Sequence, residues 1–370
     1  MHGRTLAFAV AVAISACTAA NPSTTPTPAP TREPGSLNVS ALLDLSGSRA
    51  PSGAPQRDAL QLWADQHATG SPRVRLKIVD VGGSPSKTVL ELRRAAVEDR
   101  ADAIVVGVPL DYDQPFAAAV QLAQVPVLFT LPITDPAVAG GWAFALAPTP
   151  AQLARAVLDH AAARAVLTST VVVSDESVTA ISERAALVAE MSRRGVTANV
   201  IKVTASDAGQ RLRAIPPLTP IVFFAGTPKS YLDGARQSAT GTLLYLSYLS
   251  DLGDIADLRE AAAQATWPGS RWIAAGTSAN QARTAFAESY ADRAGAPTSP
   301  AATAYDALSL LTAAAEGGIE PVRMRDQLQA ARFAGIATTY TFSMSRRAGF
   351  AFDDLALLGY TGARTAPVIR

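Results

Sequence analysis

The side chains able to do chemistry in this sequence of 370 residues are carboxylates, hydroxyls and rings in short loops. Ser46-Gly47 follows an apolar stretch, and backbone amides at such a turn can hold an anion where a helix begins. A purely structural turn is the alternative. Asp111-Tyr112-Asp113 places two carboxylates and a ring in one loop, and Asp175-Glu176 is a second acidic pair. Neighbouring acids in a loop are more often solvated than catalytic, so these groups favour binding over catalysis.

The sequence argues against an enzyme. It contains no Gly-x-Ser-x-Gly elbow, no Walker or dinucleotide glycine pattern, and no Ser/His/Asp set with a His in a suitable loop. The single cysteine, Cys17, excludes an intrachain disulfide and a Cys-based zinc site. His67 and His160 are far apart in the sequence, and we interpret both as helix-surface residues. We therefore predict no catalytic residue, no cofactor and no metal.

The charges nearly cancel. The chain has 32 Lys and Arg against 31 Asp and Glu, for a formal net charge of +1. No basic stretch is long enough to follow a phosphate backbone. Nucleic acid is therefore not an expected partner.

The N-terminus has the pattern of an export signal. Arg4 precedes an apolar run at 6–14, which is too short to span a bilayer and is followed by small residues. Ile14-Ser15-Ala16-Cys17 resembles the bacterial lipobox, in which the cysteine is acylated. The resemblance implies a signal peptide over 1–16 and an extracytoplasmic protein anchored to the bacterial cell membrane by lipid at Cys17. Ordinary secretion with cleavage near Ala20 is the alternative.

A spacer and then a folded body are expected after Cys17. Residues 17–36 are rich in Pro, Thr, Ser and Ala, with almost nothing to bury, which is typical of an extended linker. About 335 residues remain, which is a length typical of two domains. Apolar stretches of strand length alternate with helical patterns along this part, so the fold class is α/β with parallel sheets covered on both faces.

The alternation restarts after Pro148, which favours two lobes over one long sheet. Strands are predicted at 37–43, 74–79, 103–106, 125–130, 170–173, 198–203, 221–224, 243–248, 339–343 and 356–360. Helices are predicted near 60–64, after Pro85, and at 115–123, 152–163, 181–193, 231–236, 280–293, 300–315 and 321–331.

Four segments, in this order, resemble one family. They are ALLDLSG at 41–47, VG at 106–107 with VPV at 125–127 and TDP at 134–136, AYDA at 304–307, and YTFS at 340–343 with residues 346–350. The chain is similar to the substrate-binding proteins of ABC transporters with the type I periplasmic-binding fold, in the branch that binds leucine, isoleucine and valine.

The resemblance implies two doubly wound parallel-sheet lobes joined by a three-segment hinge. Lobe 1 would combine 37–147 with 276–338, and lobe 2 would combine 148–275 with 339–370. Ligand would lie in the cleft, where loops follow the carboxyl ends of the strands, and the lobes would close on it by hinge motion.

The resemblance also assigns ligand contacts. Ser46, Gly47 and Thr134 fall on family contact positions, although Thr134 also suits a loop cap before Asp135-Pro136. In place of a serine-rich loop, the chain has Asp111-Tyr112-Asp113. The two carboxylates of this loop would repel an ordinary α-carboxylate.

In the second lobe, Asp175 lies in a turn without the family's tyrosine, and Gly226-Thr227-Pro228 lacks the family's rings. The acid that pairs with a ligand ammonium falls near Tyr248, where only Asp251 can substitute. A cationic ligand, or a neutral aromatic one, would suit Asp111, Tyr112, Tyr248 and Asp251. A solvent-facing position is the alternative for each.

The resulting hypothesis is a lipid-anchored solute-binding protein. It captures a small, amino-acid-like or related ligand in the interlobe cleft for an ABC importer, with the transporter permease as partner and a monomer as the oligomeric state. The alternative is a sensory or accessory lipoprotein that uses the same fold to signal to a partner protein without transport.

Overall fold

The chain divides into two units. All of the described residues belong to the second, the compact unit Arg32–Arg370. The computed structural model describes residues 35–136, 141–204, 206–216, 219–226, 241–250, 252–274, 280–330, 332–363 and 365–369. Within these ranges, every helix is too short or too polar to cross a membrane. The predicted signal peptide, linker and lipidated Cys17 lie outside the described residues, as does the helix expected at 231–236.

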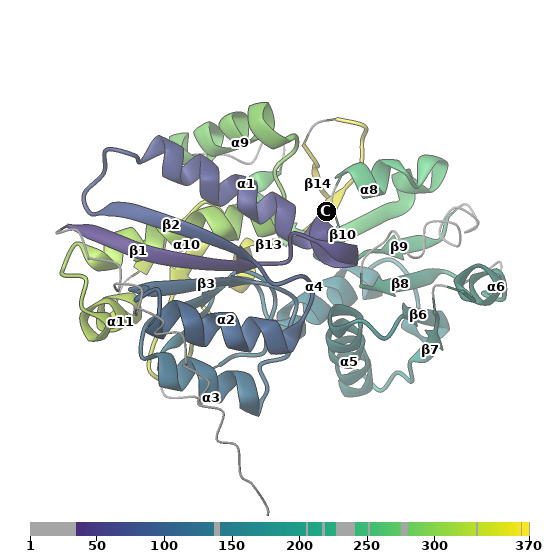
Figure 1. Cartoon of the computed structure of the whole chain (residues 1–370). Coiled ribbons are helices and arrows are strands. Elements are labelled where there is room, and N and C mark those ends of the chain that lie inside the picture. The colour runs from purple at the N-terminus through teal and green to yellow at the C-terminus, as the bar shows by residue number, and fades with distance from the viewer. Residues whose placement is uncertain are drawn as a thin grey trace, which may run out of the picture. The chain divides into compact units, whose positions relative to one another are not determined.

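The first sheet has five parallel strands in the order β2-β1-β3-β4-β5. Figure 1 shows β2, β1 and β3 side by side. The central strands β1 and β3 are almost wholly buried, because helices cover both faces. The edge strand β2 instead exposes every second residue over Arg73, Arg75 and Lys77. The strands are β1 (Ser36–Leu43), β2 (Arg73–Asp80), β3 (Ala103–Gly107), β4 (Val127–Phe129) and β5 (Ala143–Ala145).

Two sets of helices sandwich this sheet, and together they form the first lobe. One core cluster joins the sheet to α1, α9 and α10, and another joins it to α2 and α3 on the opposite face. The C-terminal helices thus return to the first sheet, and Trp63 of α1 donates to Ser309 of α10 at 2.8 Å. The helices are α1 (Ala50–Gln66), α2 (Pro85–Val97), α3 (Gln114–Ala123), α9 (Gln281–Ala294), α10 (Ser299–Ala315) and α11 (Pro321–Ala330).

The second sheet has the order β14-β13-β10-β9-β8-β6-β7 and, with its helices, forms the second lobe. Strands β6 to β10 are parallel, whereas β13 and β14 join antiparallel at one side. The strands are β6 (Thr170–Ser174), β7 (Asn199–Lys202), β8 (Ile221–Ala225), β9 (Leu243–Tyr245), β10 (Ala265–Ser270), β13 (Leu355–Gly359) and β14 (Val368–Ile369). The helices are α4 (Pro150–Ala162), α5 (Val178–Arg193), α6 (Ala208–Arg213) and α8 (Leu252–Ala256).

The chain passes between the lobes after β5, after β10 and after a hairpin of β11 (Arg332–Ala334) and β12 (Thr339–Thr341). The α/β fold with two parallel-sheet lobes is therefore as predicted. The predicted boundary at 338–339 falls between the two strands of this hairpin, and the exact lobe boundaries stay predictions.

Several elements differ from the prediction for local reasons. The sequence analysis did not predict β10, because Pro268 and Gly269 are typical of turns. In the folded chain Gly269 is required for space, since a Cβ there would lie 2.7 Å from Leu358 Cδ1. The strand predicted at 125–130 is shorter, and α4 and α5 begin two to three residues before their predicted starts.

The two histidines differ in their surroundings. His67 is exposed at the end of α1 and stacks on Trp63 with ring centroids 4.2 Å apart, as expected for a helix-surface residue. His160 of α4 is half-buried, and its Nδ1 lies 2.7 Å from the hydroxyl of Tyr245. Burial lowers the pKa of His160. His160 therefore lies on a helix, as predicted, but it is half-buried and contacts Tyr245 instead of lying at the helix surface.

One buried amide joins the segments that lead into the loops of the first sheet. Gln56 of α1 is fully buried, and its Nε2 donates to the carbonyl oxygen of Gly107 at 2.9 Å. Gln56 Oε1 accepts from Thr130 Oγ1, and the carbonyl of Thr130 accepts from Thr303 Oγ1 at 2.8 Å. Helices α1 and α10 are thereby tied to the ends of β3 and β4.

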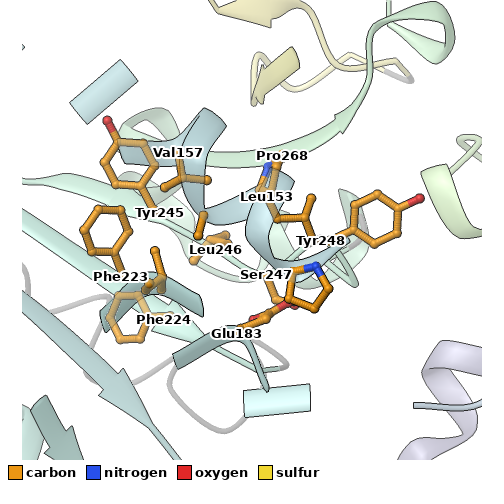
Figure 2. A pocket seen from close by; sticks show the side chains of 13 residues that line it. Leu153, Val157, Glu183, Phe223, Phe224, Tyr245, Leu246, Ser247, Tyr248 and Pro268 are labelled. Atoms are coloured by element: carbon orange, nitrogen blue, oxygen red, sulfur yellow. The ribbon is translucent and has the colours of Figure 1, made fainter. Parts of the chain in front are cut away.

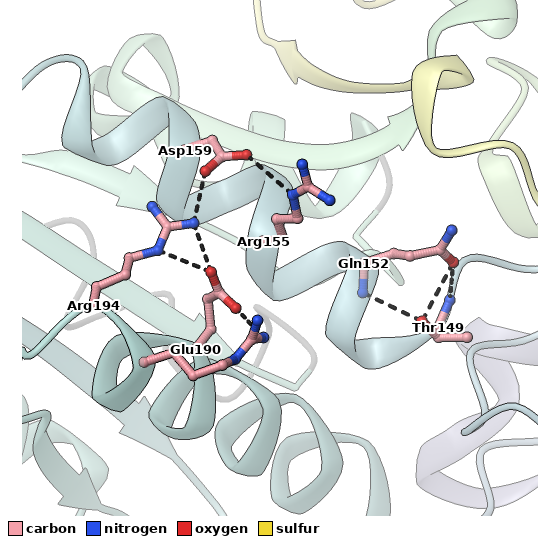
Figure 3. A network of polar contacts seen from close by, with 7 residues as sticks. Thr149, Gln152, Arg155, Asp159, Glu190 and Arg194 are labelled. Carbon is pink, nitrogen blue, oxygen red and sulfur yellow. Dashed lines mark hydrogen bonds and ion pairs between the residues drawn. The ribbon is translucent and has the colours of Figure 1, made fainter.

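Helix α4 is held by polar contacts at both ends (Figure 3). At its start Thr149 and Gln152 form a capping box, in which Gln152 Oε1 accepts from the backbone N–H of Thr149 at 2.9 Å. The amide of Gln152 also donates to the carbonyl of Phe350 at 3.2 Å, which joins two of the segments that cross between the lobes. At the other end Arg194 donates to Asp159 at 2.6 Å and ties α5 to α4.

Gly107→Ala should disrupt the Gln56 network. An added Cβ would lie 2.3 Å from Gln56 Oε1 and 2.5 Å from Leu43 Cδ2, both of which are buried. We expect the free energy of unfolding to fall by about 2–4 kcal/mol from overpacking and a lost buried hydrogen bond. Urea unfolding of the two proteins measures this difference.

Gly209→Ala in α6 is the matched control, because its Cβ would meet only Arg213 Nη1, at 3.9 Å. Its unfolding free energy should be unchanged or higher by up to about 1 kcal/mol. Equal midpoints for wild type and Gly107→Ala would contradict the proposed role of this glycine.

Candidate functional site

A cavity of about 250 Å³ lies where the loops after β1, β2 and β3 meet. These are the carboxyl ends of parallel strands, where α/β sheets bind small molecules. Val178, at the start of α5 in the second lobe, closes part of the wall. The polar side chains that line the cavity are Asp44, Arg49, Ser84, Ser86, Thr88, Asp111 and Asp113.

Asp44 is the most deeply buried acid of this cavity, with 0% of its surface exposed. Its Oδ1 accepts from the backbone N–H of Gly83 at 2.7 Å. Its Oδ2 has no hydrogen-bond partner among the described residues. Burial raises the pKa of Asp44, although the Gly83 amide and the charge of Arg49 oppose this effect. This oxygen is therefore an unused hydrogen-bond acceptor on a residue that lines the cavity.

The sequence analysis did not assign Asp44 a role, although it ends the first predicted strand. Asp44 stands at the carboxyl end of a parallel strand, which is the edge where the loops of an α/β sheet bind ligands. That position is the signal in the sequence that identifies it.

Ser46 and Gly47 are exposed and are not among the residues that line the cavity. The side chain of Ser46 instead hydrogen-bonds Asp80, whose Oδ1 also accepts from the backbone N–H groups of Leu45 and Gly82 at 2.9 Å each. The Ser46 hydroxyl and these amides lower the pKa of Asp80. The donors around this turn thus already hold a carboxylate of the chain itself, and a ligand contact at Ser46 or Gly47 stays a prediction.

The loop after β3 separates its acids from its ring. Asp111 is exposed and lines the cavity, and Asp113 also lines it while capping α3 through the backbone N–H of Phe116 at 3.1 Å. Tyr112 packs edge-on against Phe129 with centroids 5.6 Å apart, and it is not among the lining residues. Burial raises the pKa of Tyr112 to about 12. Tyr112 is therefore placed in the core of the first lobe.

A smaller gap of about 20 Å³ connects this cavity to the second lobe. It shares Pro109, Leu110 and Val178 with the cavity, so the two spaces are neighbours along the same walls. From the first lobe the gap is lined by Pro109, Leu110, Leu131 and Pro132, and from the second by Val178, Thr179, Ser182, Glu183 and Leu249. The gap is therefore an interlobe space with mostly apolar walls.

Glu183 of α5 is the carboxylate of this gap, and it also lines a pocket of about 30 Å³ inside the second lobe (Figure 2). Its Oε1 accepts from Ser247 Oγ at 2.6 Å and its Oε2 from the backbone N–H of Gly226 at 2.9 Å. Burial raises the pKa of Glu183 to about 7, and these donors and the backbone N–H of Tyr248 oppose the rise. Glu183 thus fastens α5 to the ends of β8 and β9.

The remaining predicted site residues lie apart from the cavity. Thr134 is exposed, and its neighbour Asp135 accepts from the backbone N–H of Arg347 at 3.0 Å. Asp175 accepts from the backbone N–H of Ser177 at 2.9 Å, just before α5. Neither residue is among those that line the cavity or the gap.

Tyr248 is buried, with 1% of its surface exposed. It lines the pocket of Figure 2, where its ring points away from the cluster of Phe223 and Tyr245. Burial raises the pKa of Tyr248. Asp251 lies outside the described residues. Of the eight predicted ligand residues, the structure brings Asp111 to the cavity and Tyr248 to the neighbouring pocket, and ligand contact by any of them stays a prediction.

Glu183 should make stability depend on pH. Its pKa is raised from 4.5 to about 7 in the folded state, so the folded chain holds the proton more tightly than the unfolded chain does. The contribution of Glu183 to the unfolding free energy is then fully present below pH 4.5 and is lost as the pH rises through about 7, by on the order of 3 kcal/mol. Asp306, whose pKa burial also raises to about 7, adds a fall in the same direction.

Glu183→Gln keeps the shape and removes the ionisation, so urea unfolding between pH 4.5 and 8 should show a smaller fall than in wild type. Glu288→Gln, at an exposed carboxylate of α9, is the control and should keep the wild-type slope. An unchanged slope in Glu183→Gln would contradict the assignment.

Comparisons with known proteins extend over both lobes. A family model described as periplasmic binding protein matches residues 36–362. An extracellular ligand-binding receptor from Rhodopseudomonas palustris has a TM-score of 0.75 and 16% sequence identity, with 90% of this chain and 100% of that chain covered. The leucine-binding protein LivK from Thermotoga maritima has a TM-score of 0.73 and 15% identity, with 90% and 98% covered. LivJ from Streptococcus pneumoniae, solved with isoleucine, has a TM-score of 0.71 and 14% identity, with 90% and 99% covered.

No curated protein sequence matches the chain. At the identities above, the solved structures establish the fold. The family model matches the sequence itself, from the first strand of the first lobe through β13 of the second. Both walls of the cavity and the gap lie within that match. The prediction of a binding protein that is not an enzyme is confirmed, and the chain belongs to the periplasmic binding proteins.

Proposed function

We propose that this protein captures a small solute between its two lobes and delivers it to an ABC importer. The observation that carries the proposal is the cavity with its neighbouring gap, since residues of both lobes line each of them. A ligand there would contact both lobes, and closure around it would exclude water. The neighbours that bind leucine or isoleucine support an amino-acid-like or related ligand.

The proposal includes the place of the protein in the cell. The lipobox-like residues that end in Cys17 support lipid anchoring on the extracytoplasmic side of the membrane, and the Pro-rich linker would let the body stand away from the surface. The transporter permease is the partner in this proposal, and the protein acts as a monomer.

Thermal unfolding of the purified protein against amino acids, amides, polyamines, aromatic acids and sugars tests solute binding. A ligand at 100 times its Kd stabilises the folded state by about 2.7 kcal/mol, which raises the Tm by a few degrees. One chemical class should produce this shift. Val178→Trp should abolish the shift, because Val178 lines both the cavity and the gap.

Val166→Trp is the matched control, since Val166 is 70% exposed elsewhere in the second lobe. It should leave the shift intact. A cooperative melt with no shift for any compound, or an equal shift in Val178→Trp, would contradict the proposal and favour a sensory or accessory role.

Cys17→Ala should release the protein from the membrane without changing its melting temperature. The substitution removes the acylation site and leaves the folded body unaltered. Fractionation of cells that express each form provides the measurement. Retention of Cys17→Ala in the membrane fraction would contradict the lipid anchor.

A further inference from the structure

We infer that the ligand of this protein is an organic cation, whose protonated amine or guanidinium is received by Asp44 and Asp111 in the cavity of the first lobe. The inference rests on the proposed function and names the chemical class of its solute.

The first argument is the unsatisfied oxygen of Asp44. This side chain is fully buried, lines the cavity, and has one oxygen without a hydrogen-bond partner among the described residues. A buried polar group without a partner is costly, and an ionised carboxylate only accepts hydrogen bonds. The complement is therefore a donor, and a positively charged N–H group forms the stronger and shorter bond.

The second argument is the charge of the wall. Among the described lining residues, Asp44, Asp111 and Asp113 are acidic and Arg49 is the one cation. The charge of Arg49 already acts on Asp44, and Asp113 already accepts from the backbone of α3. The exposed carboxylate of Asp111 remains on the same wall, so a cation entering the cavity meets an excess of negative charge. An anion would be repelled.

The size of the cavity and the apolar part of its wall also suit a small organic ligand. Its volume of about 250 Å³ lies near the lower end of the roughly 300–1,000 Å³ typical of small-molecule sites, so it suits a small solute. Val89, Val108 and Leu110 provide apolar wall for an alkyl chain. No group of three or more His, Cys, Asp or Glu among the described residues has the arrangement of a metal site, which favours an organic cation over a metal ion.

Glu183 does not serve as the receiving group. Both of its oxygens already accept hydrogen bonds within the second lobe, from Ser247 and Gly226. Asp44, which is fully buried, lines the cavity, and Glu183, which is half-buried, lines the gap; of these two, Asp44 keeps a buried oxygen without a hydrogen-bond partner among the described residues.

Titration calorimetry on the full chain tests this assignment with matched pairs of probes. Putrescine, arginine and lysine are the cations. Their counterparts without the terminal charge are 1,4-butanediol for putrescine, citrulline for arginine and norleucine for lysine. We expect at least one cation to bind, and to bind at least tenfold more tightly than its counterpart.

Asp44→Asn and Asp111→Asn should each weaken that binding at least tenfold, which corresponds to about 1.4 kcal/mol. Asp111 is exposed, so Asp111→Asn tests the inference even if Asp44→Asn fails to fold. Asp292→Asn, at an exposed carboxylate of α9 outside the cavity, is the control and should bind as wild type does.

Equal binding of a cation and its counterpart, or wild-type affinity in the folded variants, would overturn the inference. So would a folded wild-type protein that binds no cation in the set. If norleucine, citrulline or another compound of the wider panel binds while the cations do not, the solute-binding function stands and only the cation assignment fails.

Discussion

A buried side-chain amide sets the geometry on which the first lobe depends. Gln56 has no access to solvent, so its donor and acceptor must be satisfied inside the protein. They are satisfied only if the ends of β3 and β4 lie at fixed positions against α1, since Gly107 and Thr130 provide the partners. The loops that follow these two strands form much of the cavity and the gap. The loops that form the binding surface are therefore held in position by the buried contacts of Gln56 with the ends of β3 and β4.

The second lobe uses the same device with a different group. Glu183 lies on α5, the helix that follows the first strand of its sheet, as Gln56 lies on the helix that follows β1. It joins the ends of β8 and β9 through Gly226 and the segment 247–248. An amide fastens the first sheet and a carboxylate the second, so of these two contacts only the one in the second lobe can ionise. The part of the site that the second lobe contributes is therefore positioned by an ionisable group, the carboxyl of Glu183.

The strands and helices with continuous apolar runs were predictable, because burial on both faces leaves a clear pattern. The sheets' less regular parts were not, since β10 contains Pro268 and Gly269 and owes its place to neighbours from other segments. Asp111 was correctly expected near the strand ends. Spacing alone could not show that Tyr112 turns into the core. Glu183 was missed because its partners lie more than 40 residues away in the chain.

The cationic edge of the first sheet has a consequence for association between copies of the chain. Strand β2 is an edge strand, and Arg73, Arg75 and Lys77 are exposed along it. An edge strand is a template for adding a further strand, and charged side chains along it are one way in which proteins prevent this. A second copy that approached to extend the sheet would bring its own Arg and Lys side chains against these, with Lys77 paired to Asp99 in each copy. The charged side chains of β2 therefore oppose extension of the first sheet from one copy to the next.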